Sequence, residues 1–161
     1  MRLVRISRWR LSAKRAAGVF AERLPAKKPG LDDLLALLDS RGVPKAVATA
    51  TESRLAVAQL GGLDLLDRFS ALATADEVVD GKPAPDLFLL AAQRLGVEPS
   101  GCLVLEDSEA GIVGAHRAGM RVYAVPDLKP PSPAIEAFAQ GRFDSLAAVE
   151  RRLRRLLRTV A

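Results

Sequence analysis

Apolar residues recur along this chain at two spacings, one typical of helices and the other of buried strands. In residues 31–40, Leu31, Leu34, Leu35 and Leu38 lie at positions i, i+3, i+4 and i+7, which predicts an amphipathic helix. The same spacing predicts helices over residues 51–60, 85–95 and 108–118, and a last helix that begins after Asp144 and Ser145. Short apolar runs predict strands over residues 45–49, 102–105 and 121–125, with a weaker candidate at 69–73.

Strands and helices alternate in this pattern, and the strands are apolar throughout. Such strands are typical of a parallel sheet that helices cover on both faces, so the sequence predicts an α/β fold. In open sheets of this kind, ligands bind at the carboxyl ends of the strands. The residues that follow each predicted strand are therefore the candidates for chemistry.

Two of the predicted strands are followed by polar groups. The strand at 45–49 ends in Thr49, and Ala50 leads into the next helix, where a hydroxyl and free backbone N–H groups can bind an anion. An ordinary helix-capping threonine is the alternative. The strand at 102–105 is followed by Glu106 and Asp107, and adjacent carboxylates repel each other unless a cation neutralises them. They suit Mg²⁺, although simple helix capping explains them equally well.

Lys82 lies between Gly81 and Pro83, and Pro85 stiffens the chain that follows. A lysine on such a turn is a positioned point charge that can bind phosphate. Taken alone, it is more typically an ordinary surface lysine.

Three segments, AVATATES, GKPAPDLF and VLEDSEAGIVGAHRAGM, occur in this order between residues 46 and 120. Together they resemble the haloacid dehalogenase (HAD) superfamily, and within it the branch of phosphatases and β-phosphoglucomutase-like enzymes. The resemblance covers about residues 29–150 and implies a Rossmann-like core with a parallel sheet. It implies Mg²⁺-dependent phosphoryl transfer on a small phosphorylated metabolite.

The resemblance also implies roles for five residues. Thr49, Ala50 and Lys82 match positions that bind the phosphoryl group, and Thr49 and Lys82 are the candidate catalytic residues. Glu106 and Asp107 match the acidic pair that holds Mg²⁺. Phosphoryl transfer depends on charge neutralisation and positioning, which these residue types supply.

One motif of the family is not found. Its nucleophile is the first Asp of an Asp-x-Asp motif at the end of the first core strand, and no Asp-x-Asp occurs in the 161 residues. We therefore expect the first, central strand of the sheet and most of the cap to be missing, with two strand edges left unpaired. We expect the chain as given to be an inactive HAD-like hydrolase. The alternative is a non-catalytic remnant that binds phosphate or Mg²⁺ weakly or interacts with another protein.

We divide the chain into a basic segment, 1–28, and a core, 29–161, which is mildly acidic up to residue 149 and ends in a second basic stretch at 150–161. Residues 1–28 hold nine Lys/Arg and one acid, and residues 29–149 hold ten Lys/Arg and seventeen Asp/Glu. We expect the basic segment to be a cap-helix remnant or sequence from a mis-set translation start. A transit peptide and an arm that binds RNA or a membrane surface are the other interpretations.

Composition excludes several classes of protein. One Cys and one His rule out a disulfide framework and a multi-histidine metal site. No apolar run approaches the roughly 20 residues of a membrane span, so we expect a cytoplasmic protein with no membrane partner. Few aromatic residues and an acidic core argue against a specific nucleic-acid partner. The oligomeric state is left open.

Overall fold

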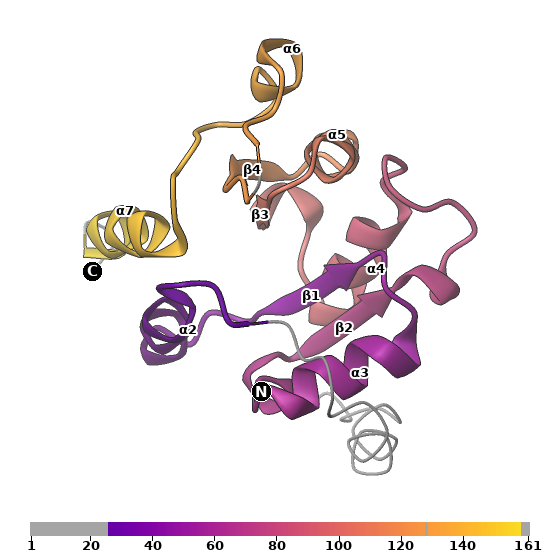
Figure 1. Cartoon of the computed structure of the whole chain (residues 1–161), viewed down its shortest axis with the longest axis horizontal. Helices are drawn as coiled ribbons and strands as arrows, with labels where there is room; N and C mark the ends of the chain where they lie inside the picture. The colour runs from indigo at the N-terminus through magenta and orange to yellow at the C-terminus, as the bar shows by residue number, and fades with distance from the viewer. Residues whose placement is uncertain (1–25, 128, 159–161) are drawn as a thin grey trace.

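The computed structural model describes residues 26–127 and 129–158. It confirms an α/β arrangement in which helices alternate with four short parallel strands (Figure 1). The strands are β1 (Ala46–Thr49), β2 (Ala71–Thr74), β3 (Leu103–Glu106) and β4 (Arg121–Ala124). The helices are α2 (Leu31–Ser40), α3 (Ser53–Gly62), α4 (Asp86–Leu95), α5 (Glu109–Arg117), α6 (Pro133–Glu136) and α7 (Leu146–Arg158).

The strands pair two by two. β1 pairs with β2 in parallel, from Ala46 opposite Ala71 to Thr49 opposite Thr74. β3 pairs with β4, also in parallel, from Leu103 opposite Arg121 onwards. Among the described residues no ladder joins one pair to the other, so the strands form two separate two-stranded sheets.

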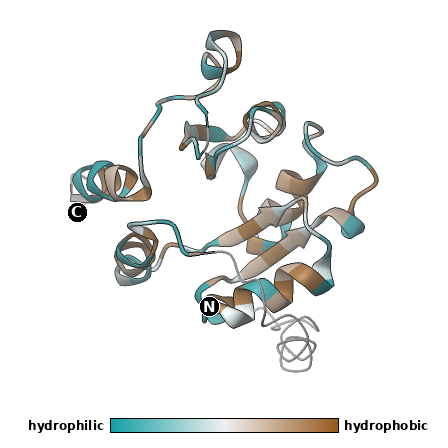
Figure 2. Cartoon of the chain, in the orientation of Figure 1, coloured by the Kyte–Doolittle hydropathy of each residue, from teal (hydrophilic) through white to brown (hydrophobic). Residues whose placement is uncertain are grey.

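Helices cover both faces of each sheet, which places the apolar residues of the strands in the interior (Figure 2). α3 packs on one face of β1–β2 and α4 on the other. α5 packs on one face of β3–β4, while α2 and α7 pack together on the opposite face. The side chains alternate accordingly, because Val122 of β4 belongs to the α5 side and Tyr123 to the α2–α7 side.

Helix α4 holds the two sheets side by side. Its Leu87 and Ala91 pack against β2, and its Phe88 and Ala92 join the cluster formed by α5 and β4. Ala48 of β1 packs against that same cluster. A two-stranded sheet is marginal on its own, so this shared packing stabilises both pairs.

The strands that face each other are the less buried ones. All four residues of β1 are half-buried, whereas all four of β2 are buried. In the other pair, Leu103, Val104 and Leu105 of β3 are half-buried, and β4 is buried after Arg121. Figure 1 places β1 and β3 on the facing sides of the two sheets. The less buried strand of each pair therefore lies toward the middle of the molecule.

The predicted ends of the helices and strands are confirmed to within two residues. α3 begins at Ser53 because the Ser53 N–H donates to Asp76 Oδ1 at 2.8 Å, a cap supplied by the turn after β2. The sequence pattern did not predict the short helix α6. Predictions for residues 1–25 lie outside the described residues, and residues 26–28 are not helical. In the part of the chain described, no helix has the length and apolarity needed to cross a membrane.

Candidate functional site

Lys82 and Glu106 form an ion pair at the carboxyl end of β3. The Lys82 ammonium donates to Glu106 Oε1, and the side chains are only 13% and 8% exposed. The same ammonium lies 5.0 Å from the centroid of the Phe88 ring, so α4 supports the lysine from one side. The structure thus brings together two residues, 24 positions apart, that the sequence analysis singled out.

Glu106 is held by the beginning of α5. Its Oε2 accepts from the Ser108 Oγ at 3.1 Å and from the Ser108 N–H at 3.4 Å. The Ser108 Oγ in turn accepts from the Gly111 N–H at 3.1 Å, as a helix cap. A Cβ at Gly111 would lie 2.1 Å from the Glu106 carboxylate, so this glycine is what lets the carboxylate approach the helix. The sequence analysis did not identify Gly111.

Asp107, by contrast, points to the surface, with its side chain 50% exposed. Lys28 Nζ lies 3.3 Å from Asp107 Oδ2 and 3.5 Å from Asp127 Oδ2, which follows β4. Each member of the acidic pair therefore has its own lysine. Lys28 is 79 positions from Asp107, and no local pattern in the sequence identifies it.

Thr49 and Ala50 lie at the carboxyl end of β1. The Thr49 Oγ1 accepts from the Thr51 N–H at 3.1 Å, and Ala50 is exposed. Within residues 26–127 and 129–158, no hydrogen bond joins Thr49 to Lys82 or Glu106. The structure therefore places the threonine at the end of one sheet and the ion pair at the end of the other.

A polar network fixes the start of α3 beside Thr49. The Ser53 Oγ lies 2.5 Å from the Thr74 Oγ1, and Asp76 accepts from both the N–H and the hydroxyl of Ser53. The hydrogen bond from the Ser53 N–H is the main cause that lowers the pKa of Asp76, and a hydrogen bond from the Thr74 hydroxyl lowers it further. The sequence analysis missed Asp76, because its capping partner is 23 residues away.

The residues at the end of β3 offer few free oxygen ligands to Mg²⁺. Both Glu106 oxygens are engaged by Lys82 and Ser108, which leaves Asp107 as the freer carboxylate. The described residues contain no group of three or more His, Cys, Asp or Glu able to hold a metal. Mg²⁺ prefers one or two carboxylates and keeps several waters, so such a sparse set is compatible with it.

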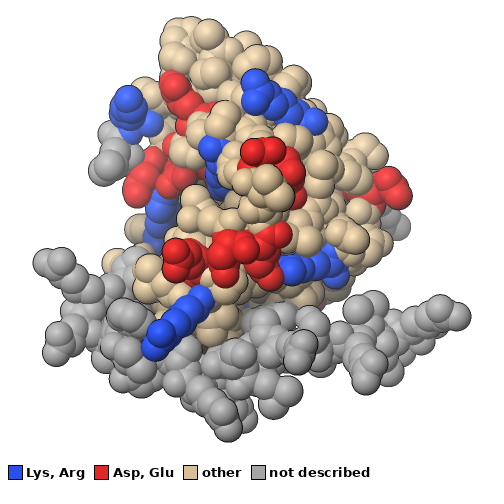
Figure 3. All heavy atoms as spheres, turned by 90° about the vertical axis from the view of Figure 1, so that its right-hand side faces the viewer, with Lys and Arg blue, Asp and Glu red and all other residues tan. Residues whose placement is uncertain are grey.

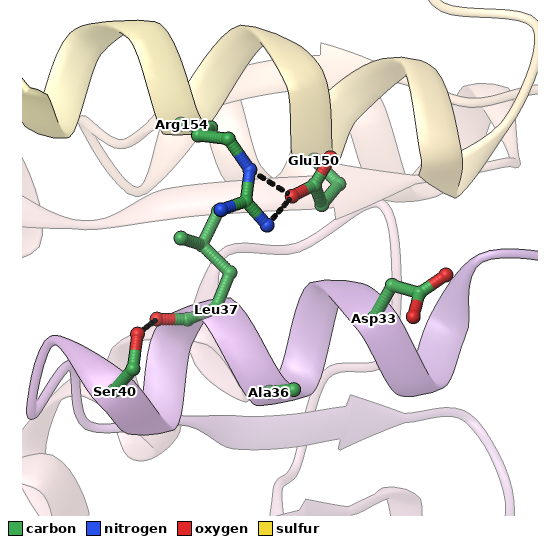
Figure 4. Close-up of a pocket in the computed structure, with 6 residues that line it drawn as sticks. All are labelled: Asp33, Ala36, Leu37, Ser40, Glu150 and Arg154. Atoms are coloured by element: carbon green, nitrogen blue, oxygen red, sulfur yellow. Dashed lines mark hydrogen bonds and ion pairs between the residues drawn. The ribbon is translucent and has the colours of Figure 1, made fainter.

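A shallow groove of about 450 Å³ lies elsewhere, between α2 and α7 (Figure 4). Its polar lining includes Glu150, which forms an ion pair with Arg154 on the same helix. None of its lining residues is a candidate site residue. On the face shown in Figure 3, acidic and basic side chains are interspersed, which gives no continuous basic surface there.

Comparisons with known proteins identify the family of this chain. The sequence model of haloacid dehalogenase-like hydrolases matches residues 7–119. The Bacillus subtilis protein YhcW is 35% identical over 133 residues, which cover 81% of this chain and 60% of YhcW. The fructose-1-phosphate phosphatase YqaB of Escherichia coli is 52% identical over 77 residues, 48% of this chain and 41% of that enzyme.

A solved structure matches as well. It is a β-phosphoglucomutase-like protein from Thermotoga maritima, with a TM-score of 0.76 and 33% identity, and the match covers 89% of this chain and 65% of that one. The chain thus spans about 40–60% of the length of the curated relatives named above. It belongs to the haloacid dehalogenase-like hydrolases, in the branch of β-phosphoglucomutase-like phosphatases.

Proposed function

We propose that this chain forms the core of a Mg²⁺-dependent phosphatase that acts on a small phosphorylated metabolite. The observation that carries the proposal is the buried Lys82–Glu106 ion pair, which stands next to the exposed Asp107 at the end of β3. Phosphoryl transfer requires neutralisation of the phosphate charge, which the Lys82 ammonium and a Mg²⁺ ion held by the carboxylates would supply. The similarity to a fructose-1-phosphate phosphatase favours a phosphorylated sugar as the kind of substrate.

The residues divide into two roles. Lys82, with the hydroxyl of Thr49 and the backbone at Ala50, would bind the phosphoryl group. Asp107 would hold Mg²⁺ directly, and Glu106 would fix the position of Lys82 and of waters around the metal, because its own oxygens are already engaged. When bound, Mg²⁺ would supply positive charge against the phosphate oxygens.

We also propose that the position between β1 and β3 belongs to a strand that carries the nucleophilic aspartate. The half-buried residues of these two strands support this, since central strands of a parallel sheet are normally buried on both faces. No Asp-x-Asp occurs in the 161 residues, so we expect this chain by itself to lack the covalent route to phosphate release.

Phosphate binding tests the proposal without relying on turnover. Addition of inorganic phosphate, with chloride at equal ionic strength as the control, should raise the melting temperature of the wild-type chain. We expect Lys82→Met to abolish this rise and Lys45→Met to retain it. Lys45 is a matched control, because it is also ion-paired and well buried but precedes β1 at the opposite strand end. An equal response of both variants would contradict the proposed phosphate site.

A phosphomonoester assay with and without Mg²⁺ tests the proposal that this chain lacks the nucleophilic aspartate. We expect no turnover above background from the 161-residue chain. Mg²⁺-dependent turnover that disappears in Asp107→Asn would support the metal site but show that another residue serves as nucleophile. Absence of both phosphate binding and turnover would favour the alternative, a non-catalytic remnant that interacts with another protein.

A further inference from the structure

Lys28 connects the segment before α2 with the ends of β3 and β4. Its carbonyl oxygen accepts from the Leu31 N–H at 3.1 Å, which anchors the backbone to the first turn of α2. Its neighbour Lys27 pairs with Asp32 of the same turn at 3.2 Å. The Lys28 ammonium reaches away from that turn and lies between Asp107 and Asp127. A charged group is thus delivered to the candidate metal carboxylate from outside the HAD motif segments.

The charges at this end of the sheet explain why the position of Lys28 matters. Glu106, Asp107 and Asp127 bring three negative charges, and Lys82 pairs with the buried Glu106. Lys28 is shared by the two exposed carboxylates, at 3.3 Å and 3.5 Å. The Lys28 ammonium therefore neutralises the negative charge of Asp107, as a bound divalent cation would.

We propose that Lys28 is a tethered counter-cation of Asp107 that competes with Mg²⁺ for this carboxylate. Asp127 provides the alternative partner, so that the ammonium can pair with Asp127 alone once a metal ion binds Asp107. Lys28 then lowers the affinity for Mg²⁺ and stabilises the acidic strand end in the metal-free protein. The inference rests on the proposed function, because it takes Asp107 to be a Mg²⁺ ligand.

The size of the effect follows from exposure. The side chains of Lys28, Asp107 and Asp127 are 40%, 50% and 59% exposed, so solvent screens their interactions. Exposed ion pairs are weak, and we expect removal of the ammonium to tighten Mg²⁺ binding by about two- to fivefold. Because the Debye length shortens with added salt, the tightening should shrink as the ionic strength rises.

The experiment measures binding of Mn²⁺ by water-proton relaxation, with Mg²⁺ as the competitor, to the wild-type chain and three variants. Lys28→Met should bind both ions about two- to fivefold more tightly. Lys27→Met is the matched control, since it removes the same charge one residue away, and it should leave the affinity within the error of the wild type. Asp107→Asn should weaken binding in the wild-type background. A purely structural role for Lys28 predicts the opposite sign for Lys28→Met, namely weaker binding.

The outcomes separate the two proposals. Equal affinities of Lys28→Met and Lys27→Met, with weaker binding in Asp107→Asn, would overturn the competition while leaving the metal site in place. Equal affinities of Asp107→Asn and the wild type would overturn the metal site itself, and the inference with it. The melting temperature of each variant without metal confirms that it is folded.

Discussion

The buried pair of Lys82 and Glu106 gives the most direct test of how this site is held together. Lys82→Met removes the ammonium that lies over the Phe88 ring and leaves the Glu106 carboxylate, only 8% exposed, without its cation. Breaking a buried pair in this way typically costs 3–5 kcal/mol. Two hydrogen bonds from Ser108 remain and offset part of that loss, so we expect about 3 kcal/mol.

A double-mutant cycle isolates the interaction between the two side chains. Glu106→Gln should cost less than Lys82→Met, because the amide oxygen still accepts a hydrogen bond, and the double variant should lose about 2 kcal/mol less than the sum of the single losses. Urea unfolding at neutral pH, followed by circular dichroism, measures all four proteins. Lys27→Met serves as an exposed control and should cost below about 1 kcal/mol. If the two single losses sum to within about 0.5 kcal/mol of the loss in the double variant, the interaction is refuted.

Two further predictions concern the surroundings of the site. Gly111→Ala should displace the Glu106 carboxylate and destabilise the protein by about 1–3 kcal/mol, whereas Gly61→Ala, also helical but with open space around it, should be neutral or slightly stabilising in the same urea assay. The hydrogen bond from Arg94 is the main cause that lowers the pKa of Glu77 from its ordinary 4.5. The stability that ionised Glu77 adds to the folded protein is therefore complete above pH 4.5 and is lost as the pH falls through the lower, folded-state pKa. Glu77→Gln should therefore lose about 1 kcal/mol at neutral pH and less in acid; a loss independent of pH would contradict this.

The sequence predicted the elements well because apolar periodicity determined most of them. Tertiary contacts explain what it missed. The residue that caps α3, Asp76, follows β2 and meets Ser53 only in the folded chain. Lys28 likewise meets Asp107 only because the segment before α2 passes the end of β3. The segment GKPAPDLF identified Lys82 through the family resemblance, but it could not show which carboxylate Lys82 contacts.

The geometry of the site depends on how closely α5 approaches the loop that carries Lys82. A Cβ at Gly114 would lie 2.9 Å from both the Ala84 carbonyl oxygen and the Phe88 ring, so α5 packs directly on this loop and on α4. Arg117, one turn further along α5, donates to the Pro83 carbonyl oxygen at 3.2 Å. The helix that begins beside Glu106 is therefore also the support of the loop that delivers Lys82. Since α4 packs against both sheets, these contacts allow the ion pair to form even though no ladder joins the two sheets among the described residues.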